Sequence, residues 1–210
     1  MPDRYLRQSP LAHLHLDARA LADAALVDCG IEMAEVRHHD MLILRGQTTD
    51  AAFMAAVKKT LAISLPTEPN TAMSKRGGAD VLWLGPNEWL ISLPDGKARG
   101  LAAKLDKSLK SLHAAVIPVG EGRTIIRIAG AHARDVLAKG CPLDLHPKSF
   151  GPGQCAQSLL GRGDMLLHCA QPGRDKSNIF NIYISRSFAE YTWTWLEDAA
   201  REYGVRVVIP

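Results

Sequence analysis

A chain of 210 residues that is 47% hydrophobic and 22% charged is long enough for one large domain or two small ones with a buried core. Its formal net charge is +3, and its sequence contains no long run of like charges. This argues against a basic stripe that binds nucleic acid. No stretch reaches the ~18 apolar residues of a membrane span, and the polar N-terminus does not resemble a signal peptide. Four cysteines without CxxC spacing favour free thiols in a reduced cytoplasm, so we expect a cytoplasmic protein.

The first half of the chain begins with a lead-in, residues 1–30, that contains one short Ala/Leu-rich helix. The segment MAEVRHHDMLILRG, residues 33–46, predicts a strand or a hairpin. The elements expected next are, in chain order, a helix over 48–63, a long polar loop over 64–79, a hairpin over 80–94, a helix over 96–112 and a strand over 114–120. The helix over 48–63 has Asp50 as a good cap and Phe53, Val57 and Leu61 on one face.

The second half partly repeats this order. The elements expected there are a strand over 123–130, a helix over 131–140, a hairpin over 153–170, a strand over 178–185, a helix over 187–204 and a strand over 205–210. The two halves therefore predict an α/β (α+β) protein made of two serial split β-α-β, ferredoxin-like units with mixed sheets. We expect the units to span residues 31–120 and 121–210, after the lead-in.

The segment GCPLDLHPKSFGPGQCAQ, residues 140–157, raises the question of a metal or catalytic site. The candidate ligands in and near it are Cys141, His146, Cys155, His168 and Cys169. A structural zinc site usually has two close pairs of ligands, and this segment lacks a closely spaced cysteine pair. Prolines and glycines dominate it and fix backbone angles, so the pattern favours a rigid turn over a metal site. The residues assigned to this turn are Cys141, Pro142, Leu143, Asp144, His146 and Pro147.

No group of residues in the sequence has the spacing of a nucleophile beside its base, a P-loop or a dinucleotide fingerprint. Cys141 follows a predicted helix, where the negative end of the dipole disfavours a thiolate. The sequence therefore predicts no catalytic residue, no cofactor ligand and no metal ligand in this chain.

The tryptophans are the remaining candidates for function. Trp83 and Trp89 flank the predicted turn at residues 85–87, and Trp193 lies about 140° around the last helix from Phe188. That helix also carries an apolar stripe, which consists of Phe188, Tyr191, Trp195 and Ala199. Exposed tryptophan is typical of protein interfaces, so Trp83, Trp89 and Trp193 are interface candidates. A second buried side of the helix explains Trp193 equally well.

The segments RTIIRIAGAHARDVLAKGCPLDLHPKSFGPGQCAQSLLGRGDMLLH and FNIYISRSFAEYTWTWLEDAAREYGV resemble the gamma subunit of heterotetrameric sarcosine oxidase. The hairpin VLWLGPNEWLI is similar to the LGPxEWL segment of that family. The resemblance covers residues 80–205 and is weaker over the first 75 residues. It implies a fold similar to the folate-binding aminomethyltransferase of the glycine cleavage system.

The resemblance also implies a role. The family's subunit is small and noncatalytic, and it assembles with alpha, beta and delta subunits. The complex oxidises sarcosine to glycine, makes hydrogen peroxide, and passes the one-carbon unit to tetrahydrofolate or releases it as formaldehyde. Its FAD, FMN and NAD sit in the other subunits. The alternative is a stand-alone folate-binding protein of the aminomethyltransferase type, for which Glu88, Glu121 and Asp144 are the possible pterin-binding carboxylates.

Overall fold

The computed structural model of the protein describes residues 7–75, 77–170 and 178–210, so part of the predicted lead-in lies outside the described residues. Contacts divide the chain into two units. The first unit contains the chain up to Arg37, then residues 123–152 and 158–210. The second contains residues 38–122 and 153–157. These units differ from the expected boundaries because the strand at residues 31–36 pairs with strands from the second half of the chain.

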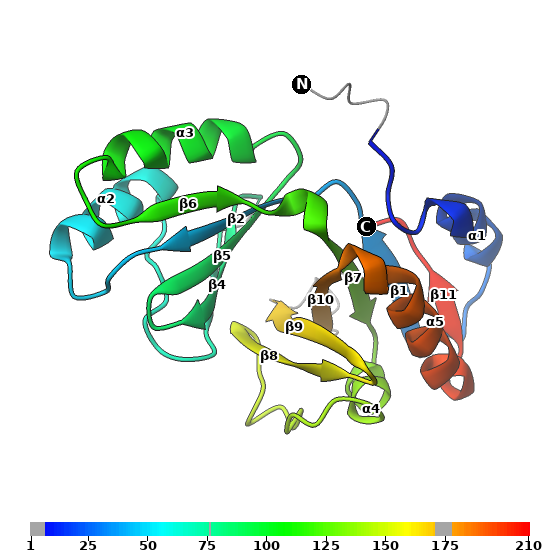
Figure 1. Cartoon of the computed structure of the whole chain (residues 1–210). Helices are drawn as coiled ribbons and strands as arrows, with labels where there is room; N and C mark the ends of the chain where they lie inside the picture. The colour runs from blue at the N-terminus through cyan, green and yellow to red at the C-terminus, as the bar shows by residue number, and fades with distance from the viewer. Residues whose placement is uncertain (1–6, 76, 171–177) are drawn as a thin grey trace. The chain divides into compact units, whose positions relative to one another are not determined.

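The first unit is built on a six-stranded sheet with the order β11-β1-β7-β10-β9-β8 (Figure 1). The strands of this sheet are β1 (Ile31–Val36), β7 (Arg123–Ala129), β8 (Gln154–Leu160), β9 (Gly163–Ala170), β10 (Ile179–Ser185) and β11 (Val205–Val207). Residues 154–157 of β8 are grouped with the second unit. Its helices are α1 (Leu16–Asp23), α4 (Ala133–Ala138) and α5 (Ala189–Ala200), with short 3-10 turns at Ala12–Leu14, Arg186–Phe188 and Arg201–Tyr203. β1 runs parallel to β11, whereas β1–β7, β7–β10 and β10–β9 are antiparallel.

The second unit is an antiparallel sheet of five strands with the order β3-β4-β5-β2-β6. Its strands are β2 (Asp40–Arg45), β3 (Ala72–Ser74), β4 (Asp80–Gly85), β5 (Glu88–Leu93) and β6 (Ala115–Pro118). Its helices are α2 (Ala51–Leu61) and α3 (Ala98–Leu109), followed by a 3-10 turn at Gly120–Gly122. Figure 1 shows the two helices side by side along the sheet. The predicted order of strand, helix, strand, strand, helix and strand is confirmed, with β3 as an addition.

The segment 33–46 does not form a hairpin. It contributes β1 and β2, but β1 pairs with β7 and β11 while β2 pairs with β5 and β6 in the other sheet. His38, between the two strands, has a φ of 53°, a left-handed conformation that ends the first strand. The prediction of a strand or a hairpin over this segment is correct in expecting strand structure, but a local pattern carries no information about which sheet each strand joins.

The core of the second unit lies between its sheet and its two helices. Phe53, Val57 and Leu61 of α2 are buried there, as their four-residue spacing predicts. Leu105 and Leu109 contribute the matching face of α3. The described residues of the whole chain contain no helix with the length and apolar character needed to cross a membrane.

The N-terminus of α2 supports a first prediction. The Asp50 carboxylate accepts the backbone N–H groups of Ala52 at 2.9 Å and Phe53 at 3.1 Å. Asp50→Ala leaves both donors without this acceptor, so we expect a loss of about 1 kcal/mol in the free energy of unfolding. Urea denaturation measures it. Asp50→Asn is the control and should retain most of the stability; equal stability of Asp50→Ala and wild type would contradict the cap.

Candidate functional site

The segment after α4 turns sharply and places apolar side chains inside the first unit. Cys141, Leu145 and Phe150 are buried, while Pro142 and Pro147 are exposed. The backbone N–H of Cys141 still donates to the carbonyl of Leu137 in α4, at 2.9 Å. Leu145 therefore anchors the segment. Leu143, which was assigned to the same turn, is only half-buried.

Asp144 and His146 hold the turn by hydrogen bonds to the backbone. The Asp144 carboxylate accepts the N–H of His146 at 3.0 Å, and the Nδ1 atom of His146 accepts the N–H of Lys148 at 3.2 Å. Hydrogen bonds from the Ser149 side chain and from the His146 backbone lower the pKa of Asp144. Local bonds of this kind are how Asp stabilises turns. His146, one of the candidate metal ligands, is thus engaged together with Asp144 in hydrogen bonds that shape the turn.

Arg134 of α4 is the centre of this corner, and no sequence pattern indicated it. Its guanidinium donates to the carbonyl oxygens of Leu145 and Phe150, the latter at 2.8 Å, and to the side-chain oxygen of Asn178 at 3.3 Å. It also lies 5.0 Å from the centre of the Phe180 ring. An arginine fork suits several acceptors at once. Because these acceptors lie 11 to 44 residues away, sequence spacing gave no signal for Arg134.

The remaining thiol candidates lie in protected positions. Cys155 belongs to the second unit, where its Sγ donates to the carbonyl of Thr71 at 3.3 Å. Burial raises the pKa of the Cys155 thiol to about 11. Burial also raises the pKa of Cys169, in the first unit, although Arg134 opposes this effect. Among the described residues, no group of three or more His, Cys, Asp or Glu side chains is arranged to hold a metal ion.

The raised pKa of Cys155 predicts a pH dependence of stability. Between pH 9 and 11 the folded state keeps the thiol proton, while the unfolded chain, where the thiol has its ordinary pKa of 9.0, releases it. The unfolded state then binds fewer protons, so the free energy of unfolding falls as pH rises through this window. Urea denaturation from pH 8 to 11 measures the slope. Cys155→Ala is the control and should show a shallower slope; equal slopes would contradict the assignment.

Two of the three tryptophans proposed as interface residues are core residues, which corrects that expectation. Trp89 is 0% exposed, packs 5.9 Å from Phe53 between ring centres, and donates its indole N–H to the carbonyl of Pro66 at 2.8 Å. Trp193 is also 0% exposed and donates to Glu197 at 3.2 Å. Trp83 is half-buried and packs against the core of the second unit. Burial of a tryptophan ring is favourable when its indole N–H has a hydrogen-bond acceptor inside the protein.

The buried face of α5 differs from its predicted apolar stripe. The buried side chains are Ala189, Thr192, Trp193, Leu196 and Ala200. Phe188 and Tyr191 are 42% and 38% exposed. Both faces carry large apolar residues, so periodicity alone did not determine which face the sheet covers.

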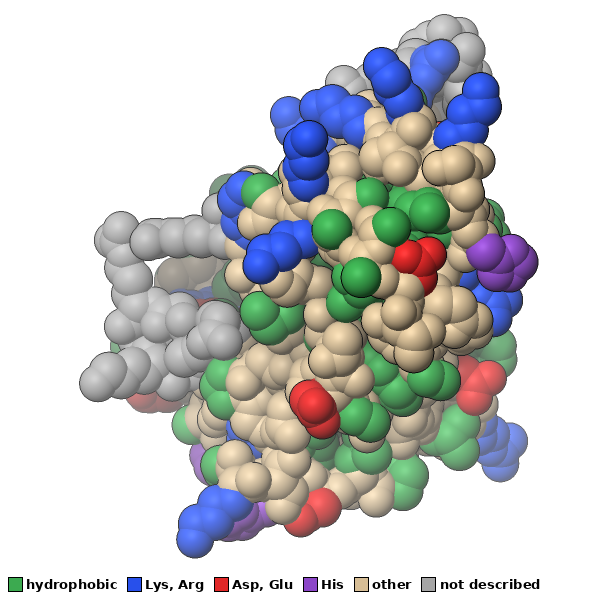
Figure 2. All heavy atoms as spheres, turned by 90° about the vertical axis from the view of Figure 1, so that its left-hand side faces the viewer, with side chains coloured by type: hydrophobic (Ala, Val, Ile, Leu, Met, Phe, Trp, Pro, Cys, Tyr) green, Lys and Arg blue, Asp and Glu red, His purple; other side chains and the backbone are tan. Residues whose placement is uncertain are grey.

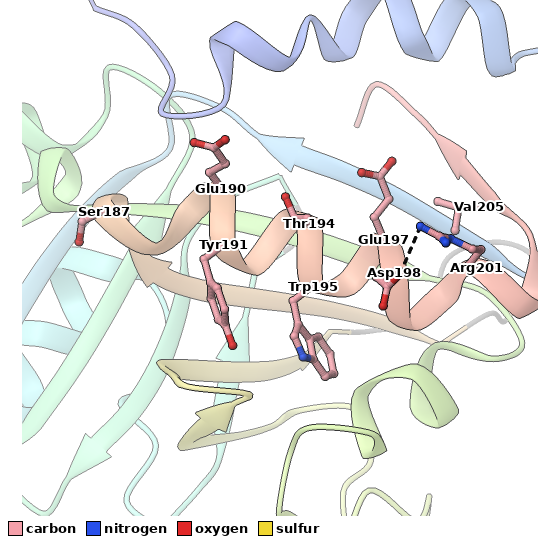
Figure 3. A pocket seen from close by; sticks show the side chains of 9 residues that line it. All are labelled: Ser187, Glu190, Tyr191, Thr194, Trp195, Glu197, Asp198, Arg201 and Val205. Carbon is pink, nitrogen blue, oxygen red and sulfur yellow. Dashed lines mark ion pairs between the residues drawn. The ribbon is translucent and has the colours of Figure 1, made fainter.

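The outer face of α5 borders a shallow hollow of about 1020 Å³ (Figure 3). It is lined by Ser187, Glu190, Tyr191, Thr194, Trp195, Glu197, Asp198, Arg201 and Val205. Figure 3 shows Tyr191 and Trp195 pointing to one side of the helix and Glu190 and Glu197 to the other. Asp198 and Arg201 form an ion pair at 3.2 Å.

Tyr191 and Trp195 pack closely against the backbone of two glycines. A Cβ atom at Gly140 would lie 2.4 Å from the Trp195 ring, and one at Gly161 would lie 2.6 Å from the Tyr191 hydroxyl. The Tyr191 hydroxyl also accepts the N–H of Arg162 at 3.1 Å. The aromatic side of the hollow is therefore part of the contact between α5, the corner and the β8–β9 turn.

Comparison with known proteins gives one consistent result. The chain matches the sarcosine oxidase, gamma subunit family over residues 45–202. It is 32% identical to the sarcosine oxidase subunit gamma of Corynebacterium sp. (strain U-96) over 206 residues. The aligned region covers 97% of this chain and 94% of the relative. It is 32% identical over 201 residues to the subunit of the same name from Arthrobacter sp.. That aligned region covers 95% of this chain and 92% of the relative.

Solved structures agree with these relatives. A chain of the heterotetrameric sarcosine oxidase from Corynebacterium sp. U-96, in complex with pyrrole 2-carboxylate, matches with a TM-score of 0.81 and 30% identity, over 94% of this chain and 96% of that one. The glycine cleavage system aminomethyltransferase T from Bartonella henselae matches with a TM-score of 0.68 and 16% identity, over 97% of this chain and 59% of that one. The second match shows a shared fold, and it confirms the predicted aminomethyltransferase-like architecture.

Proposed function

We propose that this chain, which belongs to the sarcosine oxidase gamma subunit family, is a noncatalytic assembly subunit of a heterotetrameric sarcosine oxidase. The observation that carries the proposal is the match to a chain of a heterotetrameric sarcosine oxidase, over 94% of this chain and 96% of that one, at a TM-score of 0.81. The similarity to curated gamma subunits over more than nine-tenths of both chains supports it.

The proposed complex demethylates sarcosine to glycine, produces hydrogen peroxide and transfers the one-carbon unit to tetrahydrofolate. Its other subunits, alpha, beta and delta, hold FAD, FMN and NAD, and the complex works in the cytoplasm. This chain contributes shape and contacts to the assembly. The contacts of its polar side chains support that role. Arg134 and Asp144 form hydrogen bonds with the backbone of the corner, and Cys155 is a protonated, buried thiol.

The alternative function, folate binding by the isolated chain, requires a carboxylate aimed into a pterin pocket. Asp144 is exposed and accepts a backbone N–H of its own turn. Glu88 lies 3.8 Å from Arg45, and Glu121 is exposed on a 3-10 turn. The residues considered for this role therefore do not fit a pterin site. Titration with tetrahydrofolate tests it, and micromolar binding, about −8 kcal/mol, would favour folate binding over assembly.

The direct test of the assembly role is purification from the native host through a tag on this chain. We expect three other subunits to co-purify in constant ratio, and the eluate to release hydrogen peroxide when sarcosine is added. A tagged chain carrying a destabilised core is the control for nonspecific capture. Isolation of the chain alone, alongside an active oxidase that lacks it, would refute the proposal.

A further inference from the structure

The helices of the second unit carry an unusual concentration of positive charge. Residues 51–61 and 97–110 contain seven exposed cations, Lys58, Lys59, Lys97, Arg99, Lys104, Lys107 and Lys110. The same residues contain one acid, Asp106. The formal net charge of the whole chain is only +3. We call these seven side chains the basic helix face. Figure 2 shows blue side chains gathered along the upper part of the second unit, where Figure 1 places α3.

Within the described part of the chain, no member of the basic helix face lies within 4.0 Å of a carboxylate oxygen. The first unit differs. Its ion pairs include Arg19–Glu197, Arg37–Asp17, Lys139–Glu202, Arg201–Asp198 and Arg206–Glu32. Neighbouring like charges repel each other, and an acidic partner relieves this repulsion when it binds. Among the residues that the structure describes, the charge on these helices therefore has no ion-pair partner.

One end of this face is hollowed. A cavity of about 460 Å³ lies between the end of α2, the loop that contains Gly77 and Gly78, and the first turns of α3. Lys75, Lys97 and Lys104 line it, and its described lining contains no acidic side chain. The volume is within the range of protein binding pockets and accepts a protruding side chain. The cations and the cavity together suit a carboxylate.

The composition of the face favours a protein partner over a nucleic acid. Six of its seven cations are lysines, which lack the planar fork that arginine offers to phosphate. The only aromatic residue of the two helical segments, Phe53, is 1% exposed, so no ring is available to stack on a base. Lysine ammonium groups pair readily with scattered Asp and Glu side chains.

We propose that the basic helix face docks an acidic surface of a partner subunit, with one partner carboxylate seated among Lys75, Lys97 and Lys104. This inference rests on the proposed function, and it adds the chemistry of the contact. The partner surface carries Asp and Glu side chains spaced to meet two adjacent helices. Association driven by such charges is fast at low salt and weakens as salt rises.

The test compares two double variants with the same change in charge. Lys97→Glu/Lys104→Glu reverses charge on the face, and Lys148→Glu/Arg162→Glu reverses two exposed cations of the first unit. Each full-length variant is titrated against the remaining subunits of the native complex at several salt concentrations. Thermal melting of each variant checks that the fold is intact. We expect the Kd of the face variant to rise at least tenfold with a reduced salt dependence, and that of the control to change less than threefold.

The outcomes separate the two proposals. If the wild-type chain binds the subunits and both double variants weaken binding equally, or neither does, the docking surface is refuted while the assembly role stands. The docking surface would also be refuted if the wild-type chain bound double-stranded DNA in a salt-sensitive way and Lys97→Glu/Lys104→Glu lost that binding while its affinity for the subunits stayed unchanged. If the wild-type chain itself does not bind the subunits, the assembly role fails and the docking surface fails with it.

Discussion

Trp89→Ala should lower the free energy of unfolding by about 4 kcal/mol, because it removes a large ring from a close-packed core. Trp89 is 0% exposed, contacts Phe53 and donates to the carbonyl of Pro66. The substitution leaves a cavity and a carbonyl without its donor. For a chain of this size, a loss of this amount lowers the midpoint of thermal unfolding by about 8–16 °C. Urea and thermal denaturation of the isolated chain measure it.

Two controls make the Trp89 result specific. Trp89→Phe keeps most of the ring volume and loses the indole N–H, so we expect a cost of about 1–2 kcal/mol. Trp83→Ala removes a half-buried ring from the same region and should cost less than Trp89→Ala. If Trp89→Ala weakened binding to other subunits while the isolated chain kept its stability, Trp89 would be an interface residue after all.

Arg134→Met should cost about 3 kcal/mol, because it removes charged donors from carbonyl groups inside the corner. Hydrogen bonds to charged groups contribute about 1.5–3 kcal/mol each, and the carbonyls of Leu145 and Phe150 both lose theirs. Methionine keeps part of the apolar stem over Phe180. Denaturant unfolding, followed by the fluorescence of the tryptophans, measures the change.

Arg162→Met is the matched control for Arg134→Met. Arg162 is exposed, and the hydrogen bond at this position uses its backbone N–H, so the change should stay within about 0.5 kcal/mol. Arg134→Lys keeps the charge without the fork and should fall between wild type and Arg134→Met. Equal effects of Arg134→Met and Arg162→Met would mean that the corner stands without its central arginine.

The sequence predicted features that depend on neighbouring residues. Helix α2 followed from the Asp50 cap and the spacing of Phe53, Val57 and Leu61, and the hairpin of β4 and β5 followed from the turn at residues 85–87. The resemblance to the gamma subunits identified the family. The order of elements in the second unit was also correct, because each element has its own periodicity and its own breakers.

The features that the sequence did not predict depend on contacts between distant residues. β1 and β2 are neighbours in the chain but belong to different sheets. The two apolar faces of α5 could be ranked only once the packing of Trp193 was known. Arg134 looks like an ordinary helix residue until the chain after Pro142 folds back toward it. Tertiary packing decides such cases over local preference.

The pairing of β1 with β11 has a consequence for how the chain acquires its structure during synthesis. Ile31 pairs with Val205, so the parallel edge of the first sheet closes only when the C-terminal residues have left the ribosome. The second unit is almost continuous, from residue 38 to residue 122, and short loops join β3 to β4 and β4 to β5, whereas β2 pairs with β5 and β6 across longer stretches of the same segment. Local pairings form faster than distant ones. We therefore expect the second unit to fold first, and the edge of β1 that pairs with β11 to stay unpaired until residues 205–207 are available.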